Sequence, residues 1–152
     1  MRDEISEFSA KFLKEADKII PSSKEDGPLN HLFNAMRHIF FAPAKHLRPF
    51  LLYTASKIFN VREDRIMPIC VAIECIHVYS LIHDDLPAID NGDYRRERLS
   101  CHRQFDEATA ILAGDALLTL AFEILSTLNE NPEIKSEIIM TLSKSIGHNG
   151  MI

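Results

Sequence analysis

The feature that most constrains this fold is the helical spacing of apolar residues along the chain. In the first two segments they recur every three or four positions, which is the repeat of one face of an α-helix. The residues that follow this repeat are Ile5, Phe8, Phe12, Ala16 and Ile19, then Leu29, Leu32, Phe33 and Met36. The alternating pattern typical of strands is almost absent. The sequence therefore predicts an all-α fold.

Prolines and caps predict where the later helices begin and end. One helix is expected from about Leu47 to Phe59 and a second from about Arg65 to Asp85, which Pro87 closes. Asp106 is a candidate N-cap for a helix that runs to about Leu128. One apolar stripe is predicted on that helix: Ala108, Ile111, Leu112, Leu118, Phe122 and Leu125. The polar stretch between Pro87 and Arg103 is predicted to be an exposed loop, and a last amphipathic segment follows Asn131-Pro132.

Length and charge exclude several classes of protein. A chain of 152 residues with 46% hydrophobic residues is long enough for one globular domain with its own core. A formal net charge of −5 argues against a general nucleic-acid binder. The longest apolar tract, Ile69 to Ile82, is shorter than the ~20 residues that cross a bilayer, so no membrane span is expected.

The cysteines and the N-terminal segment both point to a reducing compartment. Cys70, Cys75 and Cys101 form no CxxC pair and no even disulfide framework. The N-terminal segment mixes acidic and basic residues and lacks the apolar stretch of a signal peptide. We therefore expect a cytoplasmic protein.

The helix expected from Arg65 to Asp85 carries polar residues on an otherwise apolar body. Glu74, His77, Asp84 and Asp85 are costly there unless each has a partner. His77 and Asp84 are two turns apart, so they lie on the same face. A ligand along this face could touch both residues. Taken alone, His77 is more simply a core histidine bonded to a backbone carbonyl.

A cluster of carboxylates follows at the C-terminal end of this helix, where the helix dipole disfavours negative charge. The cluster consists of Asp84, Asp85, Asp90 and Asp93. Oxygen ligands without nearby sulfur or paired histidines suit a hard cation such as Mg²⁺. A solvated acidic loop or a calcium site remains as an alternative, although the run lacks the closing glutamate of an EF-hand.

Basic residues lie close to these carboxylates in the sequence and also far upstream. Arg95, Arg96 and Arg98 follow directly, and Lys45, His46 and Arg48 lie at the start of another expected helix. Carboxylates that hold a metal beside guanidiniums that bind oxyanions are the combination a diphosphate needs. An exposed charged loop explains Arg98 equally well.

Five stretches together resemble, in order and spacing, the first half of bacterial farnesyl diphosphate synthases, which are trans-isoprenyl diphosphate synthases. These stretches are KHLRP (45–49), ECIHVYSLIHDDLPAID (74–90), DYRR (93–96), CHRQF (101–105) and ATAILAGDALLTLAFEIL (108–125). The resemblance implies the all-α isoprenoid synthase bundle around a central cavity. It also implies a prenyltransferase that condenses dimethylallyl or geranyl diphosphate with isopentenyl diphosphate, using Mg²⁺, to give farnesyl diphosphate.

The resemblance assigns roles by position. Lys45, Arg48, His77 and Arg96 would bind isopentenyl diphosphate, and Arg95 would contact the allylic diphosphate. Asp84 and Asp90 would be Mg²⁺ ligands with Asp85 in support, so Asp84, Asp85, Asp90 and Arg95 are the expected catalytic residues. Tyr79, five residues before Asp84, would limit the length of the product. Without the resemblance, Tyr79 is a core tyrosine with a bonded hydroxyl. Structural bonding and cavity lining remain equally open for Asp115.

The sequence departs from the family pattern in two loops and at its end. Pro43-Ala44 and His46 replace two glycines and an arginine, while Glu97, Leu99 and Ser100 replace glycine, proline and threonine. Residues 1–152 are expected to form the N-terminal portion of a polyprenyl synthetase domain that stops before the second aspartate-rich motif. We therefore expect a weakly active or inactive chain that forms a homodimer or pairs with a separate second-half chain. The alternative is a noncatalytic remnant or partner subunit that binds diphosphate and metal.

Overall fold

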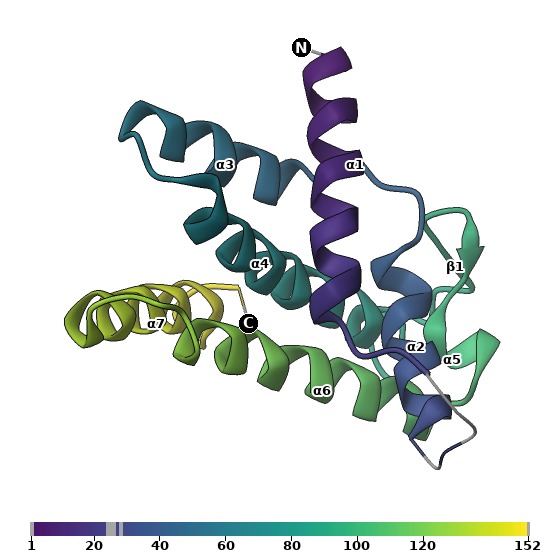
Figure 1. Ribbon diagram of the computed structural model, residues 1–152. Helices are drawn as coiled ribbons and strands as arrows, with labels where there is room; N and C mark the ends of the chain where they lie inside the picture. The colour runs from purple at the N-terminus through teal and green to yellow at the C-terminus, as the bar shows by residue number, and fades with distance from the viewer. Residues whose placement is uncertain (1, 24–26, 28, 152) are drawn as a thin grey trace.

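The protein is described by a computed structural model covering residues 2–23, 27 and 29–151, and within these residues it is a bundle of helices with one small hairpin (Figure 1). The helices are α1 (Arg2–Ile19), α2 (Asn30–Phe40), α3 (Leu47–Ile58), α4 (Glu63–Asp84), α5 (Cys101–Gln104), α6 (Glu107–Ser126) and α7 (Pro132–Ile146). Strands β1 (Tyr94–Arg95) and β2 (Arg98–Leu99) pair antiparallel. The predicted all-α fold is confirmed.

Helix α4 is the centre of the bundle. Helices α1, α2, α3 and α6 all pack against it, and α6 makes the most extensive contact. Its buried residues lie on nearly every side of the helix, as expected for a helix surrounded by others. The largest fully buried apolar side chains around it include Phe12, Phe40, Ile39, Ile82 and Leu117. The core therefore positions the C-terminal end of α4, where the acidic cluster begins.

Local signals set the ends of α6 and α7. The Asp106 carboxylate accepts a hydrogen bond from the backbone N–H of Thr109 at 2.8 Å, which confirms it as the N-cap of α6. Asn131 caps α7 by accepting from the backbone N–H of Glu133 at 2.8 Å, and Pro132 occupies the first turn. Helix α7 lies beside α6 and has no buried residue of its own (Figure 1).

The predicted apolar stripe of α6 is confirmed only in part, since Leu125 is buried and Leu118 and Phe122 are partly buried against the core. Ile111 and Leu112 are exposed, as is Ala108. The face turned to the core is instead made mainly of small residues: Ala110, Ala113, Gly114, Leu117, Ala121, Ile124 and Leu125. Small side chains let the backbones of α4 and α6 approach closely, and this close packing outweighs the burial of larger apolar residues.

The stretch predicted as an exposed loop between Pro87 and Arg103 is partly ordered and partly buried. It contains the β1–β2 hairpin and α5, and Ser100, Cys101 and His102 are buried. The hairpin is fixed to α2, since Arg98 donates to the carbonyl of His38 at 3.0 Å. His38 Nε2 also lies 2.8 Å from the carbonyl of Leu99. The hairpin is therefore held against the bundle beside the acidic cluster.

Two helices bear on the expectation of no membrane span. By length and composition alone, α4 and α6 are long and apolar enough to cross a membrane. The core helix of a soluble protein passes the same test, and 61% of the apolar window of α4 and 44% of that of α6 are buried in this fold. The absence of a membrane span therefore stays a prediction.

Candidate functional site

The acidic cluster forms a closed turn at the end of α4. The backbone N–H of Asp90 donates to the carbonyl of Asp84 at 2.9 Å, and that of Asn91 donates to Leu86 at 3.0 Å. These bonds bring both ends of the predicted aspartate motif together. The side chains of Asp84 and Asp90 are exposed, and neither carboxylate has an ion-pair or hydrogen-bond partner among the residues that the structure describes. Both are therefore open to a ligand.

Asp85 differs from its two neighbours because it is buried and already paired. Its side chain is 1% exposed, and Arg95 donates to it from Nη2 at 2.5 Å and from Nε at 3.0 and 3.2 Å. Gly92 makes room for this pair, since a Cβ there would lie 2.8 Å from Oδ1 of Asp85. The pair fixes Arg95, which remains one-third exposed, beside the turn that carries Asp84 and Asp90.

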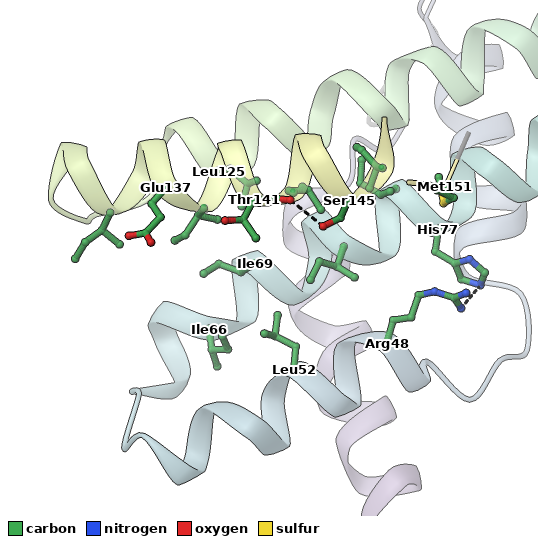
Figure 2. Close-up of a pocket in the computed structure, with 16 residues that line it drawn as sticks. Arg48, Leu52, Ile66, Ile69, His77, Leu125, Glu137, Thr141, Ser145 and Met151 are labelled. Carbon is green, nitrogen blue, oxygen red and sulfur yellow. Dashed lines mark hydrogen bonds between the residues drawn. The ribbon is translucent and has the colours of Figure 1, made fainter. Parts of the chain in front are cut away.

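Arg48 and His77 come together from α3 and α4. Nη1 of Arg48 lies 3.2 Å from Nε2 of His77 (Figure 2). A guanidinium can only donate, so His77 accepts at Nε2 and carries its proton on Nδ1. Burial lowers the pKa of His77 to about 4, and the charges of Arg48, Arg96 and Arg95 also lower it, against the charge of Glu74. The imidazole is therefore neutral near pH 7 and has one N–H left to offer a ligand.

A cavity of about 590 Å³ extends from this pair between α3, α4, α6 and α7. Figure 2 shows Arg48 and His77 near one end of it and Glu137 toward the other. Most of the remaining lining is apolar, including Leu52, Ile66, Ile69, Leu125 and Met151. A cavity of this size, mostly apolar with Arg48 and His77 at one end, suits a ligand with a polar head and a hydrocarbon tail.

The neutral His77 gives a testable pH dependence. Below pH 6.5 the unfolded chain binds a proton at His77, while the folded chain stays unprotonated there down to about pH 4. Stability is therefore lost as the pH falls through this window. His77→Gln should lose less stability between pH 7 and 4.5 in urea unfolding, whereas His148→Gln, at an exposed position, should match the wild type. Parallel curves for all three proteins would contradict this result.

One buried carboxylate, that of Glu74, contacts two basic side chains, His46 and Arg96. Nδ1 of His46 lies 3.2 Å from Oε1 of Glu74, and Nη2 of Arg96 donates to the same oxygen at 2.9 Å. Glu74 is 1% exposed. Burial alone would raise the pKa of Glu74, but the hydrogen bond from His46 and the charge of Arg96 hold it below its usual value. Glu74 is therefore a carboxylate anion inside the bundle.

The predicted site residues thus do not all lie together. Arg48 and His77 line the cavity, whereas Asp84, Asp90 and the Asp85–Arg95 pair lie at the turn after α4. Arg96, 12% exposed at its side chain, is engaged by Glu74 and by the carbonyl of Ile39 at 3.4 Å, so its direct contact with a substrate stays a prediction. Lys45 is exposed immediately before His46, with no hydrogen bond among the described contacts.

Tyr79 is buried one turn before His83. The two rings meet edge to face at 5.7 Å, and Nε2 of His83 lies 3.1 Å from the carbonyl of Ile111 in α6. Burial raises the pKa of Tyr79, and the charge of Asp84 raises it further. The proximity of this charge places Tyr79 close beneath the acidic turn. Its effect on product length stays a prediction.

Sequence reasoning missed two contacts in this region. Gly114 meets His83 so closely that a Cβ would lie 2.2 Å from Nε2, and Gly92 meets Asp85 in the same way. A glycine inside a helix is the signal that could have identified the first. Asp115 is exposed and its Oδ1 lies 3.9 Å from Nε2 of His83, which favours a polar contact at the surface over lining of the large cavity.

The hairpin turn beside the site holds two residues in the left-handed region. Arg96 (φ 51) and Glu97 (φ 63) connect the paired Arg95 and Arg98. Two-residue hairpin turns with both residues at positive φ favour glycine or asparagine. Glu97→Gly should therefore stabilise the fold by about 0.5–1 kcal/mol and raise the thermal midpoint. Glu97→Ala, which removes the same charge but keeps a Cβ, is the control, and an equal gain in both would contradict the explanation.

Comparison with known proteins places these features in a family. The polyprenyl synthetase family model matches residues 29–148. Farnesyl diphosphate synthase of Micrococcus luteus is 48% identical over 123 residues, which cover 81% of this chain and 42% of the relative. The enzyme of the same name from Haemophilus influenzae is 47% identical over 121 residues, covering 79% of this chain and 41% of the relative.

A solved structure extends the similarity to almost the whole chain. The apo FPP/GFPP synthase of Zymomonas mobilis superposes with a TM-score of 0.89 at 38% identity, covering 99% of this chain and 56% of that structure. The predicted isoprenoid synthase fold is therefore confirmed. The chain spans about half the length of the relatives it matches. On sequence and fold together, this chain belongs to the polyprenyl synthetase family.

Proposed function

We propose that this chain supplies the first metal and diphosphate site of a prenyltransferase. The reaction would join dimethylallyl or geranyl diphosphate to isopentenyl diphosphate and give farnesyl diphosphate. The observation that carries the proposal is the turn after α4, where exposed Asp84 and Asp90 lie beside an arginine locked by Asp85. The relatives named above are farnesyl diphosphate synthases, which supports this substrate class.

The donor set fits Mg²⁺. Asp84 and Asp90 offer carboxylate oxygens, which this ion prefers, while Asp85 is occupied by Arg95. Within the described residues, no group of three or more His, Cys, Asp or Glu side chains could hold a metal ion on its own. Mg²⁺ is commonly bound by one or two carboxylates together with substrate phosphates, so a partial protein site suits it. When bound, the ion would neutralise charge on the diphosphate as it leaves.

The basic residues would bind the two diphosphates. Arg95 presents its exposed edge beside the turn, with its orientation set by Asp85, and would contact the allylic diphosphate. Arg48 and neutral His77 would hold the head of isopentenyl diphosphate, with Nδ1–H of His77 as a donor. Exposed Lys45 would add a further positive charge.

The apolar parts of the structure would receive the hydrocarbon. The cavity behind Arg48 and His77 could exclude water from an apolar tail. Tyr79, buried beneath the turn, would limit the chain length and favour a farnesyl product. The half of the relatives' length that this chain does not span would come from the rest of the protein or from a second chain. A homodimer is a further part of the proposal.

The cytoplasm is the location we propose. Cys70, Cys75 and Cys101 are buried free thiols, which agrees with a reducing compartment.

Binding of inorganic pyrophosphate in the presence of Mg²⁺ tests the site directly. Asp84→Asn should weaken Mg²⁺-dependent binding by about tenfold or more in calorimetry, since one charge-assisted contact contributes about 1.5–3 kcal/mol. Asp64→Asn, at the opposite end of α4, is the matched control and should bind like the wild type. Absence of Mg²⁺-dependent binding in the wild type would overturn the proposal.

A prenyl transfer assay separates an enzyme from a binding subunit. Geranyl diphosphate, isopentenyl diphosphate and Mg²⁺ are incubated with the purified chain, and we expect weak or no turnover. A polypeptide with the second half of a relative's sequence is then added. If the chain binds pyrophosphate but still shows no turnover, a noncatalytic partner subunit is favoured. Turnover restored by such a half would favour a split or partial enzyme.

A further inference from the structure

Two strained residues from separate segments share one buried carboxylate. His46 (φ 46) lies just before α3, and Arg96 (φ 51) lies in the β1–β2 turn, so both adopt the left-handed backbone conformation. Their side chains converge on the same atom, Oε1 of Glu74, at 3.2 and 2.9 Å. A residue with a Cβ adopts this conformation at a cost, and it persists where surrounding contacts impose it. Glu74 provides such a contact for both residues.

The carboxylate is well placed to act as a common anchor. Glu74 lies in the centre of α4, the helix that most of the others pack against, and its side chain is 1% exposed. His46 is itself buried, with its ring 5.1 Å from that of Phe12. Arg96 makes a second contact to the carbonyl of Ile39. The two segments are therefore tied through Glu74 to the central helix of the bundle.

Each tied residue directly follows a basic residue of the proposed site. Lys45 precedes His46 and is exposed, while Arg95 precedes Arg96 and is held by Asp85. A change in the backbone at His46 or Arg96 would redirect its neighbour. Glu74 is also one helical turn before His77, which accepts a hydrogen bond from Arg48 at the cavity.

We infer that Glu74 is a positioning residue that sets Lys45 and Arg95 for diphosphate binding by holding His46 and Arg96 in the left-handed conformation. The part of this inference that concerns diphosphate rests on the proposed function. The anchoring of two segments by one carboxylate does not, and it can be tested without substrate. An ordinary buried ion pair would stabilise the whole fold and would not couple these two segments in particular.

Hydrogen exchange of Glu74→Gln tests the anchor. This variant keeps the size of the side chain and removes its charge. Amides of residues 44–47 and 94–99 should both exchange about tenfold faster, corresponding to 1.4 kcal/mol, while α6 is unchanged. Glu130→Gln breaks a pair with Arg65 at the other end of α4 and should leave both segments as they are. Faster exchange in one segment only, in neither, or equally in α6 would overturn the inference.

Binding of Mg²⁺ and inorganic pyrophosphate tests the positioning role. The affinity of Glu74→Gln should fall about tenfold, the lower end of what loss of a supporting contact costs. If the wild type binds pyrophosphate and Glu74→Gln binds it with the same affinity, the positioning role is overturned. A wild type that binds no pyrophosphate refutes the proposed function instead, and the exchange result still decides the anchor.

A second pair of variants covers the case in which Glu74→Gln does not fold. His46→Gly and Arg96→Gly each remove one arm of the contact while accepting the left-handed backbone. Each variant should accelerate hydrogen exchange in its own segment. If both variants exchange as slowly as the wild type in these segments, the inference is overturned.

Discussion

Replacement of Arg95 by leucine is expected to destabilise the fold by about 3 kcal/mol, because it leaves a buried carboxylate without a partner. Asp85 is 1% exposed, and all of its side-chain hydrogen bonds among the described residues come from Arg95. The loss is at the lower end of the range for a buried pair, since Arg95 is one-third exposed and partly screened by solvent. Urea unfolding measures the change.

The chain offers a matched control for this prediction. Arg103 pairs with Asp93 at 2.6 Å across the same ten-residue separation, but both side chains are about half exposed. Arg103→Leu should cost about 0–1 kcal/mol. Adding Asp85→Leu to Arg95→Leu should recover part of the loss, because the unpaired charge is then gone. Equal losses for Arg95→Leu and Arg103→Leu would contradict the assignment of a buried pair.

Replacement of Gly114 by alanine is the other large effect, expected to cost about 3 kcal/mol through overpacking. The new Cβ would lie 2.2 Å from Nε2 of His83, whose ring is held by Tyr79 and the carbonyl of Ile111. Helix propensity alone predicts the opposite sign, a gain of about 1 kcal/mol for alanine in a helix. The sign of the change in unfolding free energy therefore decides between packing and propensity.

A compensating variant identifies the clash. His83→Ala removes the ring that the new methyl group meets, so Gly114→Ala combined with His83→Ala should be more stable than the sum of the single losses predicts. Additive losses would show that the close approach of α4 and α6 is not made at His83.

Helix ends were the most predictable part of the fold, because single residues signal them. Asp106 caps α6 as predicted, and the expected helix from Leu47 to Phe59 differs from α3 by one residue. The buried face of α6 was not predictable in the same way. The sequence of α6 is apolar on several sides, so hydrophobicity alone does not identify the buried face. The face that packs against α4 is the one with small residues, which allow the two helices to approach closely.

The roles of the candidate site residues stay predictions, and only part of the contacts among them could be predicted from the sequence. Sequence placed His77 and Asp84 on one face of a helix and identified the open carboxylates. It could not show that Arg96 is engaged by Glu74, because that bond joins residues 22 apart in sequence through a left-handed turn. The hairpin was missed because its strands have two residues each and two of their four side chains are charged.

The exposure of α7 affects how firmly one wall of the cavity is held in place. This helix forms one wall through Ile134, Ile138 and Leu142, yet none of its residues is buried. A helix with few buried contacts is expected to unfold locally at a lower free energy than the fold as a whole. The volume beside Arg48 and His77 therefore depends in part on a helix that few buried contacts hold in place.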